Sequence, residues 1–278
     1  MRSIGRRGLL TFGAGTALTA AVVAGARPAD AATRWQRLVV VTANVGRNRA
    51  HPGTRRTAIK DVRHAVDGAF PLVGWQEIDE GPENDREIEW INRWFGARYR
   101  NIFEQRNHTH RVPMSIPRTY RILQRTHTNV HGGKAGVSPH RIITEALLAR
   151  RDDPDVRFAF VNTHYVAGAW NGEHDPHEGW RDRMWAKHRE THVRVLEKWR
   201  ARGVPVIWTG DVNKQRLGLL LPRHEKRAFP DGGVDQIGWI PGPSGSQTEI
   251  RLNGTRTVGM NVDSHDARVA IFHLRRRP

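Results

Sequence analysis

The chain has 278 residues, of which 45 are Lys or Arg and 28 are Asp or Glu, so its formal net charge is +17. Its length suits one large domain or two small ones, with a core that needs no disulfide or structural metal. It contains no cysteine, which excludes disulfide scaffolds, cysteine zinc sites and thiol nucleophiles. Any metal would therefore be held by Asp, Glu, Asn or His, and we expect a hard ion such as Mg²⁺, Mn²⁺ or Ca²⁺.

The positive charge comes almost entirely from arginine, which supplies 39 of the 45 basic residues. Guanidinium groups bind phosphate through two parallel hydrogen bonds, so this composition predicts a polyanionic partner such as nucleic acid. Codon bias in a GC-rich genome is the alternative explanation for the preference for Arg over Lys.

Residues 1–31 have the composition of an export signal. The basic pair Arg6 and Arg7 precedes an apolar run of small residues over 9–25, and residues 29–31 read Ala-Asp-Ala. This pattern predicts cleavage before Ala32 and resembles a twin-arginine signal. An uncleaved N-terminal anchor is the alternative, which the moderate hydrophobicity of the run disfavours. Cleavage would remove four Arg and one Asp and lower the net charge from +17 to +14. We expect a secreted monomer without stable membrane association.

The mature chain, residues 32–278, alternates apolar strands with amphipathic helices. Helices are predicted over residues 54–70, 86–95 and 180–201, and strands over 37–45, 72–78, 141–149, 156–165 and 204–208. Two short strands are expected near 234–240 and 267–274, with a hairpin around 253–254. The Arg- and His-rich stretch 104–140 matches no motif. We expect it to shape the substrate cleft and to form an irregular, partly mobile loop around 128–138. The whole pattern indicates one layered α/β domain.

Polar residues of metal- or proton-handling types stand at the ends of these apolar strands. They are Asn44, Gln76 and Glu77, Asn162 and His164, Asp211 and Asn213, Asp235, and His265. A single polar strand end is ordinary, but six in succession indicate a site at one edge of the sheets. The remaining histidines are expected at the surface or in loops.

The ordered motifs TAN, WQE, NTH, GDVN, VDQI and SHD resemble the endonuclease/exonuclease/phosphatase superfamily, in particular its deoxyribonuclease I branch. The resemblance covers about residues 36–274. It implies a four-layered α/β sandwich, in which two mixed β-sheets pack face to face with helices on the outside. It also implies a phosphoric ester hydrolase that depends on a divalent metal.

The resemblance assigns a role to each matching position. Glu77 would be the main metal carboxylate, with Asn44 beside the metal and the scissile phosphate. Asp211 would orient or deprotonate the attacking water, and Asn213 would hydrogen-bond the phosphate or that water. Such charge-offsetting groups are what phosphodiester hydrolysis requires.

Histidines complete the implied site. His265 would act on the phosphate, held in its tautomer by Asp235, and His164 would be a second histidine facing the phosphate. Asn162 would contact the substrate. Other readings stay open for individual residues: Glu77 as an exposed strand end, His164 as a structural histidine, and Asp211 as a cap for the following turn.

The sequence departs from the superfamily at its last motif, which usually reads Ser-Asp-His. Here the order is Asp263-Ser264-His265-Asp266, so Ser264 stands where the Asp belongs. Neighbours on a strand point to opposite faces, so Asp263 replaces that carboxylate only if a bulge re-aims it. Weaker metal binding, or an inactive relative, is a possible consequence.

We therefore expect a secreted, metal-dependent phosphodiesterase, with nuclease action as the first hypothesis. The same chemistry on a lipid or inositol phosphate is the second, although no apolar hairpin for a membrane surface is evident. A polyanion-binding relative with a decayed metal site is the third.

Overall fold

The computed structural model describes residues 34–46, 52–64, 69–78, 86–103, 111–170, 179–262 and 265–278. Over these residues twelve strands form two six-stranded sheets. The first sheet has the order β11 (Thr248–Val262), β12 (His265–Arg276), β1 (Gln36–Asn44), β2 (Leu72–Gln76), β4 (Met114–Pro117) and β3 (Tyr99–Ile102). The second has the order β5 (Tyr120–His131), β6 (Arg141–Arg150), β7 (Arg157–His164), β8 (Val206–Asp211), β10 (Asp235–Ile240) and β9 (Lys226–Arg227).

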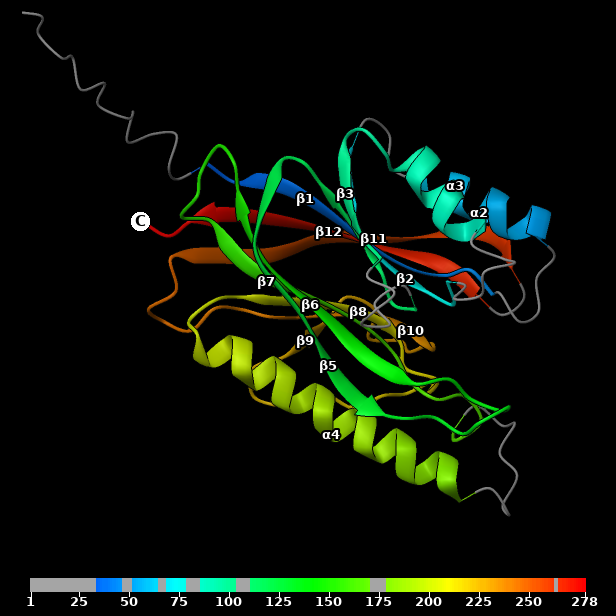
Figure 1. Cartoon of the computed structure of the whole chain (residues 1–278). Helices are drawn as coiled ribbons and strands as arrows, with labels where there is room; N and C mark the ends of the chain where they lie inside the picture. Colours follow the sequence, from blue (N-terminus) through cyan, green and yellow to red (C-terminus); the bar gives the residue numbers. More distant parts are fainter. Residues whose placement is uncertain are drawn as a thin grey trace, which may run out of the picture.

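Both sheets are mixed, because β1 and β2 pair in parallel, as do β7 and β8, while their other pairs are antiparallel. The helices lie outside the two sheets (Figure 1). Helices α2 (Pro52–His64) and α3 (Arg86–Trp94) cover the first sheet, and α4 (Trp180–Ala201) covers the second. The predicted four-layered sandwich is confirmed.

Strand alternation divides the apolar residues among three interfaces. Along β1, Leu38 and Val40 point into the cluster between the sheets, whereas Val39 and Val41 point into the cluster beneath α2 and α3. This division follows from the two-residue period of a strand. Strands buried on both faces read as continuous apolar runs, which explains the run from residue 38 to residue 41.

The two sheets approach each other closely at Gly74 on β2. A Cβ atom there would lie 2.0 Å from Oγ1 of Thr209 and 2.5 Å from Oδ1 of Asn162. Only glycine lets these polar side chains of the second sheet reach the backbone of the first.

The predicted helices and buried strands are present, although α2 ends at His64 and residues 69–70, predicted as its end, are not helical. Two further expectations are wrong. Residues 128–131 are not a loop, since they belong to β5, which pairs with β6 along its length. The Asn253-Gly254 pair is no hairpin turn, because it lies inside β11, where the register with β12 shifts between Leu252 and Gly254. A β-bulge thus gives the same sequence signal as a turn. The predicted signal, residues 1–31, lies outside the described residues.

Within the part of the chain that the structure describes, no helix has the length and apolar character needed to cross a membrane.

Candidate active site

The site residues gather at one edge of the sandwich because of the strand directions. Parallel strands end at the same edge of a sheet, and their antiparallel partners begin there. In the second sheet Asp211, at the end of β8, pairs in register with His164 at the end of β7 and with Asp235 at the start of β10. In the first sheet Asn44 pairs with Gln76 at the ends of β1 and β2.

Asp211 is the centre of this cluster and is almost completely buried. Its Oδ1 accepts a hydrogen bond of 2.8 Å from the backbone N–H of Asn213, and its Oδ2 accepts one of 2.9 Å from Nδ2 of Asn44. Burial raises the pKa of Asp211, as do the charges of Asp235 and Glu77, and the value reaches about 7 although His265 and the Asn213 N–H oppose the rise. The carboxyl group is therefore able to exchange a proton near neutral pH.

His265 and Asp235 form a hydrogen-bonded pair, with 2.8 Å between Nδ1 and Oδ2. Burial alone would lower the pKa of His265, but the hydrogen bond and charge of Asp235, together with Asp211 and Glu77, raise it to about 9. The imidazole is thus charged at neutral pH. Because Asp235 occupies Nδ1, Nε2 is the nitrogen that remains for a substrate.

Glu77 follows β2 in a left-handed backbone conformation, with φ of 58°. Its Oε1 accepts a hydrogen bond of 3.3 Å from Nδ2 of Asn44, and Oδ1 of Asn44 accepts one of 2.9 Å from the N–H of Gly46. Asn44 therefore presents its amide nitrogen, which is no metal ligand, to both Glu77 and Asp211. In this arrangement Asn44 orients two carboxylates, and its place beside a metal stays a prediction.

The cluster fits a hard divalent cation. One carboxylate oxygen of Asp211 and one of Asp235 lie within 4.8 Å of each other and of a ring nitrogen of His265; the carboxylates supply the ligand oxygens, because a charged imidazole binds no cation. Oδ1 of Asp235 is buried and has no hydrogen-bond partner, a situation that an ion or water relieves. Glu77 adds a third carboxylate close enough for its charge to raise the pKa of Asp211. Carboxylate oxygens are the ligands that Mg²⁺, Mn²⁺ and Ca²⁺ prefer.

His164 and Asn213 lie on either side of Asp211. Nε2 of His164 is 3.5 Å from Oδ2 of Asp211. Burial, with the charges of Arg141, His265 and other nearby cations, holds the pKa of His164 well below its usual range, so this imidazole is neutral. Asn213 has a left-handed backbone, with φ of 48°, and its Nδ2 donates to the carbonyl of Tyr165 at 3.0 Å.

Asn162, predicted to contact the substrate, is instead a buried link between the sheets. Its Nδ2 donates to the carbonyls of Trp75 at 2.8 Å and Pro113 at 3.0 Å, and its Oδ1 accepts from Gln76 at 2.7 Å and Thr209 at 3.0 Å. Two donors and two acceptor positions are all that an amide offers. We therefore assign Asn162 a structural role in place of the predicted one.

Asp263 and Ser264, the positions that depart from the superfamily pattern, lie outside the described residues. The strands on both sides are described, and Val262 pairs with His265.

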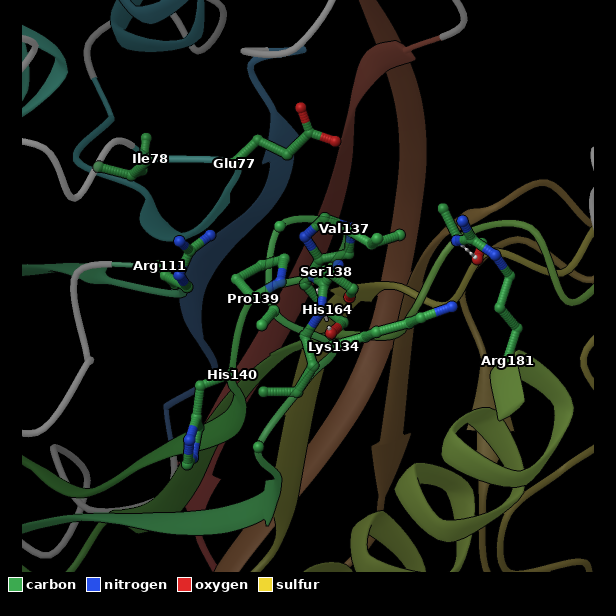
Figure 2. A pocket seen from close by; sticks show the side chains of 15 residues that line it. Glu77, Ile78, Arg111, Lys134, Val137, Ser138, Pro139, His140, His164 and Arg181 are labelled. Carbon is green, nitrogen blue, oxygen red and sulfur yellow. Dashed lines mark hydrogen bonds between the residues drawn. The ribbon is translucent and has the colours of Figure 1, made fainter. Parts of the chain in front are cut away.

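A cavity of about 580 Å³ opens beside the cluster, and Glu77 and His164 form part of its wall. Its basic lining residues are Arg111, Lys134, Arg141 and Arg181, and Figure 2 labels Arg111, Lys134 and Arg181 among them. We call this cavity the basic cleft. Residues 104–140 were expected to shape a cleft, and Arg111 and Lys134 belong to that stretch. Arg141 and Arg181 lie outside it, and no sequence signal separates them from the many other arginines of the chain.

Three other histidines contradict the expectation of surface positions. His131, His188 and His192 are buried beneath the site. Nε2 of His188 lies 2.7 Å from Oγ1 of Thr163, and Nδ1 of His192 lies 3.1 Å from the hydroxyl of Tyr165. The four-residue spacing of His188 and His192 on the buried face of α4 was the available sequence signal.

The fold is similar to that of solved proteins of the endonuclease/exonuclease/phosphatase type. An endonuclease/exonuclease/phosphatase family protein from Bacteroides thetaiotaomicron superposes with a TM-score of 0.60 at 12% identity, over 86% of this chain and 98% of that one. TDP2 from D. rerio, solved in complex with a single-strand DNA product, gives a TM-score of 0.61 at 12% identity, over 85% and 99%. A mannosyl-6-phosphatase from Bacteroides thetaiotaomicron gives 0.58 at 14%, over 85% and 99%.

At these identities the likeness establishes the fold. No protein-family model matches the sequence, and no curated protein is similar to it in sequence.

Proposed function

We propose that the chain is a metal-dependent phosphodiesterase that hydrolyses nucleic acid. The observation that carries the proposal is the placing of Asp211, a carboxyl group with a pKa of about 7, beside His164, which lines the basic cleft, and close to the charged His265. The high content of arginine supports a polyanionic substrate. The similarity in fold to a TDP2 solved with a DNA product is consistent with it.

The residues divide the work of hydrolysis. Glu77 and Asp235 would hold a divalent ion beside Asp211, and the ion would supply positive charge that offsets the charge growing on the phosphate. Asp211 accepts a proton from the attacking water as the water oxygen bonds to phosphorus. His265 donates a proton from Nε2 to the ester oxygen as the P–O bond breaks. Proton transfers of this kind contribute about 10²–10⁴-fold to a rate.

The supporting side chains keep these groups in position. The amide of Asn44 and the backbone N–H of Asn213 each bind one oxygen of Asp211, which fixes the plane of its carboxylate. Asp235 fixes the ring of His265 in the same way. Preformed geometry of this kind lowers the reorganisation needed in the transition state.

The test is cleavage of supercoiled plasmid DNA by the purified chain with Mg²⁺, Mn²⁺ or Ca²⁺, and with EDTA as the stop. We expect nicking that requires a metal and that falls at least 100-fold in Asp211→Asn. Asp231→Asn, the same change at an exposed aspartate, is the matched control. DNA that binds but survives every metal would instead support a polyanion-binding protein.

The same machinery could act on a compact phosphate ester, and the volume of the basic cleft favours testing one. Sphingomyelin and inositol polyphosphates are the substrates to compare with DNA. A kcat/KM for either that exceeds the value for DNA would overturn the assignment as a nuclease.

We also infer export, on sequence grounds, because residues 1–31 combine Arg6 and Arg7 with an apolar run. Expression in a host with a twin-arginine pathway, followed by N-terminal sequencing of the protein outside the cytoplasm, tests the inference. A new N-terminus at Ala32 is expected, and Arg6→Lys with Arg7→Lys should block export. Export of the doubly substituted chain at the normal level would contradict the route.

A further inference from the structure

The basic cleft is continuous with the catalytic cluster, since Glu77 and His164 belong to both. Among the described residues that line it, four are Lys or Arg and Glu77 is the only carboxylate. Such an excess of positive charge in a concave wall concentrates anions. In the proposed mechanism the hydrolysed phosphate lies at Asp211 and His265, and His164, which lines the cleft and is 3.5 Å from Asp211, connects that position to the cleft.

One wall of the cleft is the tip of the hairpin between β5 and β6, which holds Lys134. The N–H of Lys134 donates to the carbonyl of Ser138 at 2.8 Å, and the N–H of Ser138 returns a bond of 2.8 Å to the carbonyl of Lys134. Gly133 has a φ of 75°, and a Cβ atom there would lie 2.2 Å from the carbonyl oxygen of Ser138. The glycine thus permits a tight turn that fixes the backbone of Lys134.

Lys134 and Arg181 meet on the same indole. Nζ of Lys134 lies 5.0 Å, and Cζ of Arg181 lies 4.7 Å, from the ring centroid of Trp180. Nη1 of Arg181 also donates to the carbonyl of Ala167, in the cleft wall, at 2.9 Å. Figure 2 shows the side chain of Lys134 running toward Arg181. Two cations from different parts of the chain are therefore held against the same ring, and both line the cleft.

Arg141 and Arg111 supply the positive charge on the side of His164. Nη1 of Arg141 lies 3.4 Å from the carbonyl oxygen of His164, to which it donates. The charges of both arginines contribute to the lowered pKa of the His164 imidazole, which places them close to the catalytic cluster. The cleft is thus basic from the hairpin to the active-site edge.

We propose that the basic cleft binds a second phosphate group of the substrate, adjacent along the chain to the phosphate that is hydrolysed. This rests on the proposed function, because it names the substrate class of the same site: esters with at least two neighbouring phosphates, as in a nucleic-acid strand. Lys134 and Arg181 are the specificity-determining residues. A substrate that lacks the second phosphate makes no contact with these charged donors, so it gains no binding energy at the cleft.

The experiment compares three thymidine dinucleotides in the metal that supports activity: TpT, with one phosphate, and pTpT and TpTp, each with two. Cleavage of the internal ester is followed by chromatography of the products, and kcat/KM is determined for each. We expect at least one of the two-phosphate dinucleotides to exceed TpT by about tenfold, the effect of one charge-assisted hydrogen bond. Lys134→Ala and Arg181→Ala should each reduce this preference, and the double variant should abolish it.

The matched control is Arg121→Ala, an exposed cation on β5 outside the cleft. It removes the same charge and should leave the preference unchanged. Equal kcat/KM values for all three dinucleotides in the unaltered chain would overturn the inference while the proposed function stands. A preference that survives in the double variant would also overturn it. If no dinucleotide and no plasmid is hydrolysed with any metal, the proposed function itself fails.

Discussion

Nδ1 of His265 at the start of β12 lies 2.8 Å from Oδ2 of Asp235 at the start of β10, so this hydrogen bond joins the two sheets at the active-site edge. A second polar bond joins them nearby, from Asn44 on β1 to Asp211 on β8. Each half of the sandwich alone therefore carries an incomplete site. Residues far apart in the sequence become one chemical unit only when the sheets pack.

The first prediction concerns the pair of His265 and Asp235. Asp235→Asn removes the carboxylate that raises the pKa of His265 to about 9, so we expect that pKa to fall. His265 is charged only below its pKa. When that pKa falls, the imidazole loses its charge at a lower pH, so the rate should begin to decline at a lower pH on the alkaline side. NMR titration of His265 and the pH profile of kcat/KM measure the two effects. Hydrolysis should fall about 100-fold, within the usual contribution of an acid catalyst.

Asp266→Asn is the control for this prediction, because Asp266 is the exposed neighbour of His265. It should leave the titration and the rate nearly unchanged. An unaltered pKa of His265 in Asp235→Asn would show that the hydrogen bond does not set its charge.

The second prediction concerns proton release on metal binding. Without metal, the pKa of Asp211 is about 7, so its carboxyl group is about half protonated at neutral pH. A cation bound beside it favours the ionised form, and the proton leaves. Calorimetric titration with Mg²⁺ at pH 7, in buffers of different ionisation enthalpy, should therefore detect proton release. In Asp211→Asn the release should disappear, whereas identical heats in all buffers for the unaltered chain would exclude this linkage.

The third prediction concerns Asn162, whose four hydrogen bonds all go to protein groups. Asn162→Ala leaves Gln76, Thr209 and two backbone carbonyls without their partner. We expect the free energy of unfolding to fall by about 3 kcal/mol, since unsatisfied buried groups cost about 1–3 kcal/mol each and partial relaxation recovers some of the loss. Urea denaturation measures the change. Asn253→Ala, at an exposed position of β11, should cost less than about 0.5 kcal/mol.

The same variant also distinguishes a structural role of Asn162 from a role in binding the substrate. At temperatures where Asn162→Ala stays folded, KM for DNA should remain near that of the unaltered chain. A large rise in KM with little loss of stability would restore the substrate contact that the sequence predicts.

The site residues at the strand ends were predictable because a polar residue that follows an apolar run can be recognised in the sequence. Asn44, Glu77, His164, Asp211 and Asp235 all follow or begin such runs, and the structure brings them together at one edge. The sequence pattern does not show which atoms of a side chain face the site. A residue type cannot show that the nitrogen of the Asn44 amide, and not its oxygen, faces the carboxylates.

The sequence also does not show how deeply a residue is buried in the fold. Asn162 lies only two residues before His164, on the same face of β7, but the close approach at Gly74 places it between the sheets. The strands β3, β4 and β5 were missed because none of them has a continuous apolar run. Their pairing with neighbouring strands, and for β4 the burial of Met114 and Ile116 in the core, stabilises them as strands.

The last prediction concerns the buried histidines beneath the site. Burial lowers the pKa of His192 to about 3, with a further contribution from Arg227, and burial lowers that of His131 to about 4. In the unfolded chain a histidine titrates near 6.5, so below that pH the unfolded state binds more protons. Their contribution to stability is therefore complete above pH 6.5 and is lost as the pH falls toward 4, by about 1.4 kcal/mol per pH unit for each histidine. Urea denaturation at pH 7.5, 6.0 and 5.0 should show this loss, and His192→Gln should make its slope shallower by that amount. The exposed His224 supplies the control, since His224→Gln should leave the slope as it is. A slope unchanged by His192→Gln would show that this histidine is protonated in the folded protein.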